Sequence, residues 1–130
     1  MVGDVVAAIQ MRFDRDPCSA SRARRAVRDC LDGEPPVETM CNAVLLTSEL
    51  VTNVVTHTLT SGELVAYYDR LRKRLRIEVR DNSPGLPQMR DGFAAVRVGG
   101  FGLRLVDKVA SSWGTTTTAT GKTVWFELSW

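Results

Sequence analysis

The chain has 130 residues, of which 44% are hydrophobic and 25% charged, with a formal net charge of +2. This is the size of one domain with its own hydrophobic core, and so small a net charge gives no sign of a direct nucleic-acid partner. The three cysteines form no Cys-x-x-Cys pair, no apolar run approaches the roughly 20 residues of a membrane helix, and the N-terminus lacks a basic flank, so we expect a cytoplasmic protein without a membrane anchor.

The first elements in the chain are a short strand and a helix. Residues 1–12 are an N-terminal extension that can form a strand, and residues 16–33 follow as a helix. Pro17 suits its first turn, Ser19 is a candidate N-cap and Gly33 can end it. Its alanines and valine fall on one side, and four arginines lie around the rest: Arg22, Arg24, Arg25 and Arg28.

A longer second helix starts at Pro35-Pro36 and runs to about Thr60, with apolar residues at a 3.6-residue period. Two strands follow, at 64–68 and 74–81, joined by an exposed connection at 70–73.

Residues 82–102 are rich in Gly and Pro and show no lasting period, and a loop of this length inside a compact domain is usually functional. A third helix is predicted at 103–113, and a hairpin around Thr120-Gly121-Lys122 closes the chain. Helices thus stand apart from a mainly antiparallel sheet. The predicted class is α+β, a single domain (1–130) built as a two-layer sandwich with helices on one face of a mixed, mostly antiparallel sheet.

The second helix carries Glu49, Asn53 and His57 at four-residue spacing. Because each such step advances about 40° beyond a full turn, the three side chains form a slanting polar stripe beside the apolar face. Three residues that simply face solvent would give the same spacing. The stripe therefore indicates a site only together with features further along the chain.

Two such features follow. Asp81 ends a strand and opens the turn Asn82-Ser83-Pro84-Gly85, where a carboxylate can accept a hydrogen bond from an amino group and repels a carbonyl. The commoner use of such a sequence is an aspartate that caps a turn. Residues 99–103 place three glycines directly before a helix, where free N–H groups can receive a phosphate. Neither a Walker A motif nor the strand–helix alternation of a dinucleotide fold is present.

The order of these motifs resembles one family. ELVTN on a helix, D-x-S-P-G at a strand end, G-x-G-L opening a helix and GKT in a final hairpin resemble the ATPase domain shared by gyrase, the Hsp90 chaperone, histidine kinases and mismatch-repair proteins. The phrases SELVTN, GLRLVDKVASSWG and GKTVWFEL resemble the stand-alone bacterial anti-sigma-factor serine/threonine kinases. The resemblance covers almost the whole chain from Phe13 onward, and it implies a Bergerat-type ATP-binding fold.

The resemblance implies roles for four polar residues. Asn53 would offer its amide oxygen to Mg²⁺, a hard ion that favours oxygen ligands, and Glu49 would be the general base. Asp81 would bind the adenine amino group of ATP or ADP, and Thr123 would help through its hydroxyl, directly or through water.

The resemblance also implies that the glycines and Leu103 complete the nucleotide site. The residues that would shape the adenine wall, the lid and the phosphate end are Gly85, Gly100, Gly102 and Leu103. Residues 82–102 would contain the ATP lid. The sequence departs from the family at Ser83, where glycine is common, and its short lid carries Arg90 and Arg97. His57 matches a position where the family often has histidine, and we interpret it as an orienting or structural residue.

The function implied is an anti-sigma factor that phosphorylates a serine or threonine on an anti-anti-sigma (STAS-type) antagonist and also sequesters a sigma factor, with the ability to form a homodimer. A nucleotide-dependent binding switch without kinase activity is the alternative, left open by Ser83 and the lid. A histidine-kinase catalytic fragment is a weaker option, because no phosphoacceptor helix precedes the domain. An acidic protein partner is expected near Arg24, Arg25 and Arg28.

Overall fold

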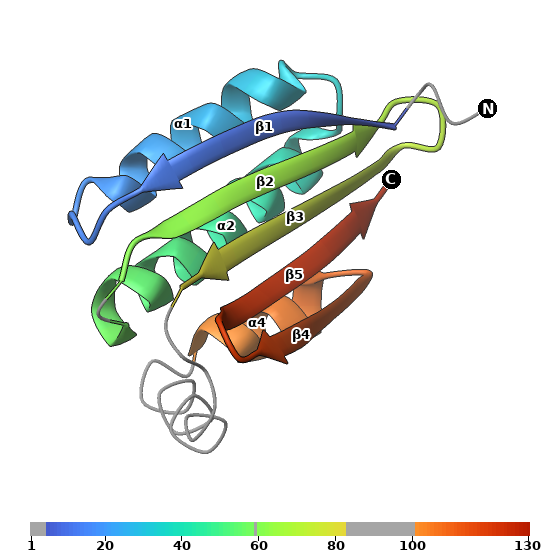
Figure 1. Cartoon of the computed structure of the whole chain (residues 1–130). Helices are drawn as coiled ribbons and strands as arrows, with labels where there is room; N and C mark the ends of the chain where they lie inside the picture. The colour runs from blue at the N-terminus through green and yellow to red at the C-terminus, as the bar shows by residue number, and fades with distance from the viewer. Residues whose placement is uncertain (1–4, 59, 83–100) are drawn as a thin grey trace.

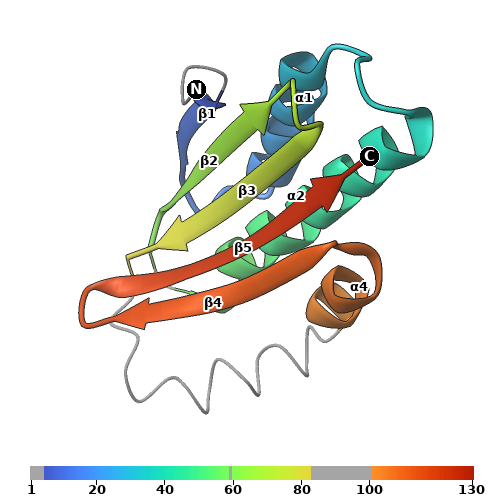
Figure 2. The ribbon, with the colours of Figure 1, turned by 90° about the vertical axis from the view of Figure 1, so that its right-hand side faces the viewer.

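The fold is an antiparallel sheet with helices packed on one of its faces (Figures 1 and 2). A computed structural model describes residues 5–58, 60–82 and 101–130. The element order is β1(Val5–Phe13), α1(Ser19–Leu31), α2(Val37–His57), β2(Gly62–Asp69), β3(Arg74–Asp81), α4(Phe101–Val109), β4(Ser112–Thr118) and β5(Gly121–Ser129). The described part of the chain has no helix long and apolar enough to cross a membrane.

The five strands lie in the order β1-β2-β3-β5-β4, and each of the pairings that join them is antiparallel. The predicted α+β two-layer class is therefore confirmed, without a parallel strand among the described residues. Strands β2 and β3 form a hairpin, as do β4 and β5. Strand β1, near the N-terminus, pairs with the outer edge of β2. The expected N-terminal strand is thus present, with a bulge between Ala7 and Ile9.

Alternation in β3 decides which side of the sheet meets the helices. Leu75, Ile77 and Val79 are buried, whereas the residues between them are half-exposed. The buried set packs against α1, α2 and α4 in one hydrophobic core that includes Leu46, Leu50 and further apolar residues of both layers. The sheet therefore has a helix-covered face and an open face.

Two local predictions are wrong. Ser19 does not cap α1: it is the first helical residue, fully buried, and its hydroxyl donates to the carbonyl of Asp14 at 2.8 Å. The third helix ends at Val109 rather than 113, because Ser112 and Trp113 already pair with β5. The left-handed Asp32 and Gly33 end α1, as the glycine indicated.

Candidate functional site

Asp81 is the best-defined residue of the candidate site. It is the last residue of β3 and pairs with Gly62 of β2 on one side and with Lys122 of β5 on the other. Its side chain belongs to the helix-covered face and is only 1% exposed, and one carboxylate oxygen lies 4.0 Å from the Lys122 ammonium. A carboxylate so withdrawn from water accepts hydrogen bonds selectively, because only partners that fit the site reach it.

Two close approaches of the backbone build the surroundings of Asp81. A Cβ on Gly121 would overlap the carbonyl oxygen of Asp81, so only glycine allows β5 to come this near to the end of β3. On the other side, the ring of Phe13 lies against Gly62, where a Cβ would be 2.5 Å from the ring. The carboxylate therefore sits between an aromatic ring carried by β1 and an ammonium carried by β5.

Glu49 and Asn53 lie on the flank of α2 that faces away from α1. Arg24 of α1 donates to Ser48 of α2 at 2.8 Å, which places α1 on the flank that carries Ser48. At about 100° per residue, Glu49 and Asn53 are turned to the opposite flank, the side on which α4 packs (Figure 2). Both are half-buried, whereas His57, at the last residue of α2, is exposed.

The elements that carry these residues meet at one end of the molecule. The C-terminal half of α2, the end of β3 and the start of β5 lie together there (Figure 1). Gly102 and Leu103 belong to the first turn of α4. Gly85 and Gly100, and with them most of the predicted lid at 82–102 including Ser83, Arg90 and Arg97, lie outside the described residues.

Thr123 is not brought to this face. It pairs with Arg80, and directly paired residues of antiparallel strands point to the same side, so its side chain shares the open face with Arg80. Lys122, which sequence reasoning passed over, occupies the place beside Asp81 that was assigned to Thr123. The alternation of VWFEL indicates that Lys122 and Thr123 point to opposite faces of the sheet. Which of the two shares the face of Asp81 follows only from the register between β3 and β5.

The donor set fits a magnesium ion held mainly by phosphates. Among the described residues, no group of three or more His, Cys, Asp and Glu side chains could hold a metal by itself. The half-buried amide of Asn53 is an oxygen donor of the kind that Mg²⁺ accepts when nucleotide phosphates and water supply the remaining ligands. The residues present are thus compatible with a metal–nucleotide complex rather than with a protein-only metal centre.

The open face carries a charge network. The Glu78 carboxylate accepts from Arg76 at 2.9 Å and from Arg80 at 2.7 Å, and the network continues to Glu127 and Glu63. Burial alone would raise the pKa of Glu78, but the hydrogen bonds and charges of Arg76 and Arg80 outweigh it, so this pKa lies below the usual glutamate value.

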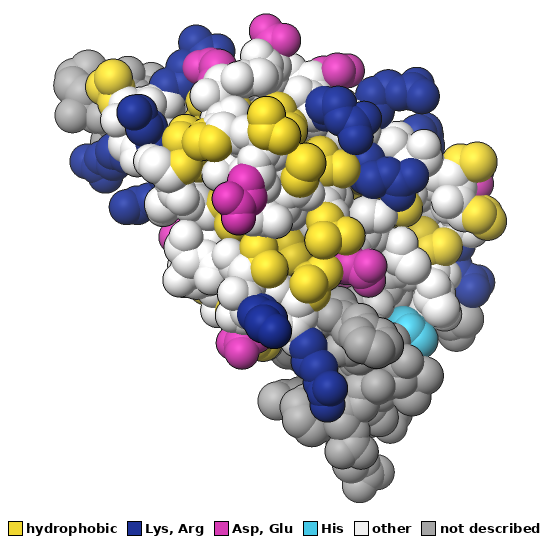
Figure 3. All heavy atoms as spheres, turned by 180° about the vertical axis from the view of Figure 1, so that it is seen from behind, with side chains coloured by type: hydrophobic (Ala, Val, Ile, Leu, Met, Phe, Trp, Pro, Cys, Tyr) yellow, Lys and Arg dark blue, Asp and Glu magenta, His cyan; other side chains and the backbone are white. Residues whose placement is uncertain are grey.

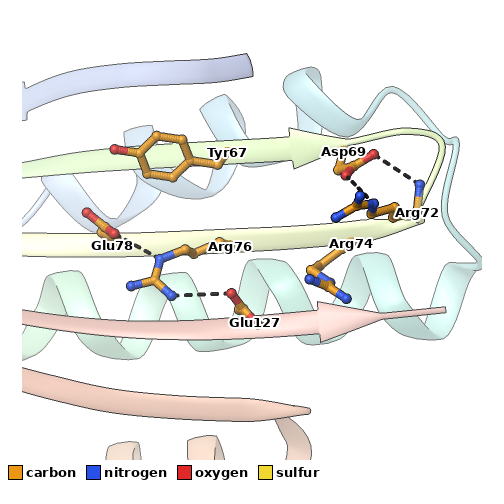
Figure 4. A pocket seen from close by; sticks show the side chains of 7 residues that line it. All are labelled: Tyr67, Asp69, Arg72, Arg74, Arg76, Glu78 and Glu127. Carbon is orange, nitrogen blue, oxygen red and sulfur yellow. Dashed lines mark hydrogen bonds and ion pairs between the residues drawn. The ribbon is translucent and has the colours of Figure 1, made fainter. Parts of the chain in front are cut away.

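A cavity of about 320 Å³ lies on this open face (Figure 4). The residues that line it are Tyr67, Asp69, Arg72, Arg74, Arg76, Glu78 and Glu127. Its acids and bases largely pair with one another, and it faces away from Asp81. It therefore takes no part in the candidate site.

Comparison with known proteins agrees with this fold. The family model for the histidine kinase-, DNA gyrase B-, and HSP90-like ATPase matches residues 42–130, from α2 to the end of the sheet. The crystal structure of the RsbU and RsbW domains of Rv1364c from Mycobacterium tuberculosis superposes with a TM-score of 0.68 at 17% sequence identity, over 93% of this chain and 32% of that one. At this identity the likeness shows a shared fold. No curated protein matches the sequence.

Proposed function

Because the chain belongs to the family of histidine kinase-, DNA gyrase B- and HSP90-like ATPases, we propose that it is an ATP-binding anti-sigma factor with serine/threonine kinase activity toward an anti-anti-sigma (STAS-type) protein. The observation that carries the proposal is the pair Glu49 and Asn53, one turn apart on the flank of α2 that faces α4, at the same end of the molecule as the buried Asp81. A pure binding module would need the nucleotide residues but not the acid.

Each residue has a chemical task in this proposal. Asp81 accepts a hydrogen bond from the adenine amino group, and the amide oxygen of Asn53 binds the magnesium ion that accompanies ATP. When bound, that ion neutralises charge on the phosphates. Glu49 takes the proton of the serine or threonine hydroxyl while the oxygen of that hydroxyl bonds to the γ-phosphorus. The bond from the γ-phosphorus to the β–γ bridging oxygen breaks, and ADP leaves with that oxygen.

The partner surface is proposed on the helix-covered side. Arg25 and Arg28 are exposed on α1, and α2 exposes Val37 and Leu45. Figure 3 shows this side, where apolar side chains gather in the middle and Lys and Arg side chains toward the ends. A sigma factor or an antagonist with acidic residues around an apolar contact would fit such a surface.

Charge reversal tests this surface. Arg25→Glu with Arg28→Glu should weaken partner binding at least about tenfold and leave ATP affinity unchanged, since neither arginine lies on the flank of Glu49. Arg24 is excluded from the variant because its hydrogen bond to Ser48 joins α1 to α2. Partner affinity and ATP affinity are measured by calorimetry. Loss of ATP binding in this variant would contradict the assignment and place the two arginines in the fold.

The setting proposed is the cytoplasm, where ATP is available and thiols stay reduced. The cysteines, Cys18, Cys30 and Cys41, are free thiols in the structure. A homodimer is also part of the proposal. The solved structure that shares the fold contains an RsbW domain. The competing function is a nucleotide-dependent switch that binds its partner without phosphorylating it.

The experiment that separates kinase from switch is single-turnover transfer from labelled ATP to the antagonist. Glu49→Gln keeps the shape and cannot take a proton, so transfer should fall about 10²–10⁴-fold while ATP affinity stays near that of the wild type. Asn53→Ala should instead weaken Mg²⁺-dependent nucleotide binding. Glu38→Gln, the same change in the exposed first turn of α2, is the matched control and should alter neither. Equally slow transfer by the wild type and Glu49→Gln would contradict the kinase and leave the switch as the function.

A further inference from the structure

Lys122 stands beside Asp81 in a row of residues that crosses the sheet. Gly62, Asp81, Lys122 and Thr117 are direct neighbours on adjacent strands, so their side-chain positions share the helix-covered face. The carboxylate of Asp81 is almost fully buried, and the side chain of Lys122 is 30% exposed. The row therefore contains a buried hydrogen-bond acceptor, Asp81, beside a more exposed donor, Lys122.

The ammonium forms an ion pair with Asp81 but does not donate a hydrogen bond to it. At 4.0 Å, the distance from the Lys122 nitrogen to the nearer carboxylate oxygen exceeds that of a hydrogen bond. Within the described part of the chain, the structure gives this ammonium no hydrogen bond. Its three N–H donors are thus available to a ligand that enters beside the carboxylate.

This pair matches the edge of one purine. Adenine presents an amino donor at C6 and an acceptor at N1, side by side, whereas guanine presents a carbonyl acceptor at C6 and an N–H donor at N1. A carboxylate only accepts and an ammonium only donates, so acceptor and donor in this order complement adenine and oppose guanine at both atoms.

We propose that Lys122 is a specificity-determining residue of the nucleotide site, which donates to N1 of adenine while Asp81 accepts from the amino group. The inference rests on the proposed nucleotide function and deepens it, since it names how the base is selected. Thr123, on the open face, takes no part. Lys122 also makes the approach of a guanine N1–H unfavourable, so it discriminates between bases as well as adding affinity.

The test combines a change in the protein with a change in the ligand. Calorimetry measures the affinity of the wild type, Lys122→Met and Thr123→Val for ATP, GTP and 1-deaza-ATP, in which a C–H replaces N1. Loss of a hydrogen bond to a charged group weakens binding about ten- to a hundredfold, so the wild type should bind 1-deaza-ATP that much more weakly than ATP. Lys122→Met should bind ATP and 1-deaza-ATP with the same affinity, which is weaker than that of the wild type for ATP. Thr123→Val should behave as the wild type.

The outcomes separate the inference from the proposed function. If Lys122→Met binds ATP as the wild type does, or if the penalty for 1-deaza-ATP persists in it, the inference is wrong while nucleotide binding stands. If the wild type binds no ATP, the proposed function fails and the inference with it. Should Lys122→Met not fold, the comparison of ATP with 1-deaza-ATP on the wild type still decides, because equal affinities would overturn the assignment.

Discussion

The two faces of the sheet treat their charges differently at neighbouring positions of the same strands. On the helix-covered face, Asp81 is almost sealed from water and has the Lys122 ammonium at 4.0 Å. On the open face, Glu78 sits between Arg76 and Arg80 at hydrogen-bond distance, with Arg76 also stacked over Trp125 at 4.1 Å. The first face has a long ion pair, and the second joins its charges into a hydrogen-bonded network.

In the proposed function, this difference separates the face that binds the nucleotide from a face whose charges pair with one another. Charges that saturate one another, as around Glu78, have little left to offer a ligand. The Lys122 ammonium, which lies beyond hydrogen-bond distance from Asp81, keeps donor capacity for a ligand that enters beside the carboxylate. The three predictions below test the surroundings of Asp81 against those of Trp125 and Glu78.

The largest effect is expected at Asp81. Asp81→Ala should weaken ATP binding by about 1.5–3 kcal/mol, because it removes a hydrogen bond to a charged group in a buried site. GTP should bind poorly to the wild type. Calorimetry on both nucleotides measures this, with Glu78→Ala on the open face as the control that should leave ATP affinity unchanged. Equal affinity of the wild type for ATP and GTP would exclude Asp81 as the residue that selects the base.

A pair of glycine variants compares added volume against the backbone beside Asp81 with added volume against a side chain. Gly121→Ala places a methyl group against the backbone carbonyl of Asp81, which cannot move without breaking the strand pairing, so the free energy of unfolding should fall by about 1–3 kcal/mol. Gly114→Ala meets only the ring of Trp125 on the open face, and a side chain can shift, so the cost should stay below about 1 kcal/mol. Urea unfolding measures both. The reverse order would show that the Trp125 ring is held more rigidly than the backbone at Asp81.

The smallest effect concerns the pH dependence of stability. Since the pKa of Glu78 is lower in the folded chain than its usual value, the ionised form stabilises the fold above the unfolded pKa of about 4.3, and this contribution is lost as the pH falls through the folded pKa. Glu78→Gln should therefore reduce the loss of stability on acidification by a few tenths to about 1 kcal/mol. Unfolding between pH 7 and pH 3 measures it. If Glu78→Gln loses as much stability on acidification as the wild type, other carboxylates determine the pH dependence.

Periodicity was sufficient to predict most of the fold. The strand at 74–81 has the predicted bounds, because alternating apolar and charged residues in a half-buried strand leave little choice of face. The predicted end of the third helix was wrong. Ala110 to Trp113 continue the helical pattern, but Ser112 and Trp113 pair with β5. Propensity alone does not reveal such a pairing.

The site was predictable as a set of residue types and less so as a geometry. Strand-end Asp81 and the stripe of Glu49 and Asn53 follow from local pattern, and the structure brings their elements to one end of the molecule. The choice between Thr123 and Lys122 depends on the register of β5 against β3. Because a shift of one residue reverses every side chain, the sequence of one strand does not decide it.

The pairing of β1 bears on the order in which the chain folds. Gln10 of β1 and its contact Glu63 are 53 positions apart, whereas the β2–β3 and β4–β5 hairpins close over short turns. Contacts between distant segments form late, because the entropy of closing a long loop must be overcome first. Although it precedes the other strands, β1 should be the last to join the sheet. Only then does the ring of Phe13 reach Gly62 beside Asp81, so a chain that has formed its hairpins still lacks one wall of the proposed nucleotide site.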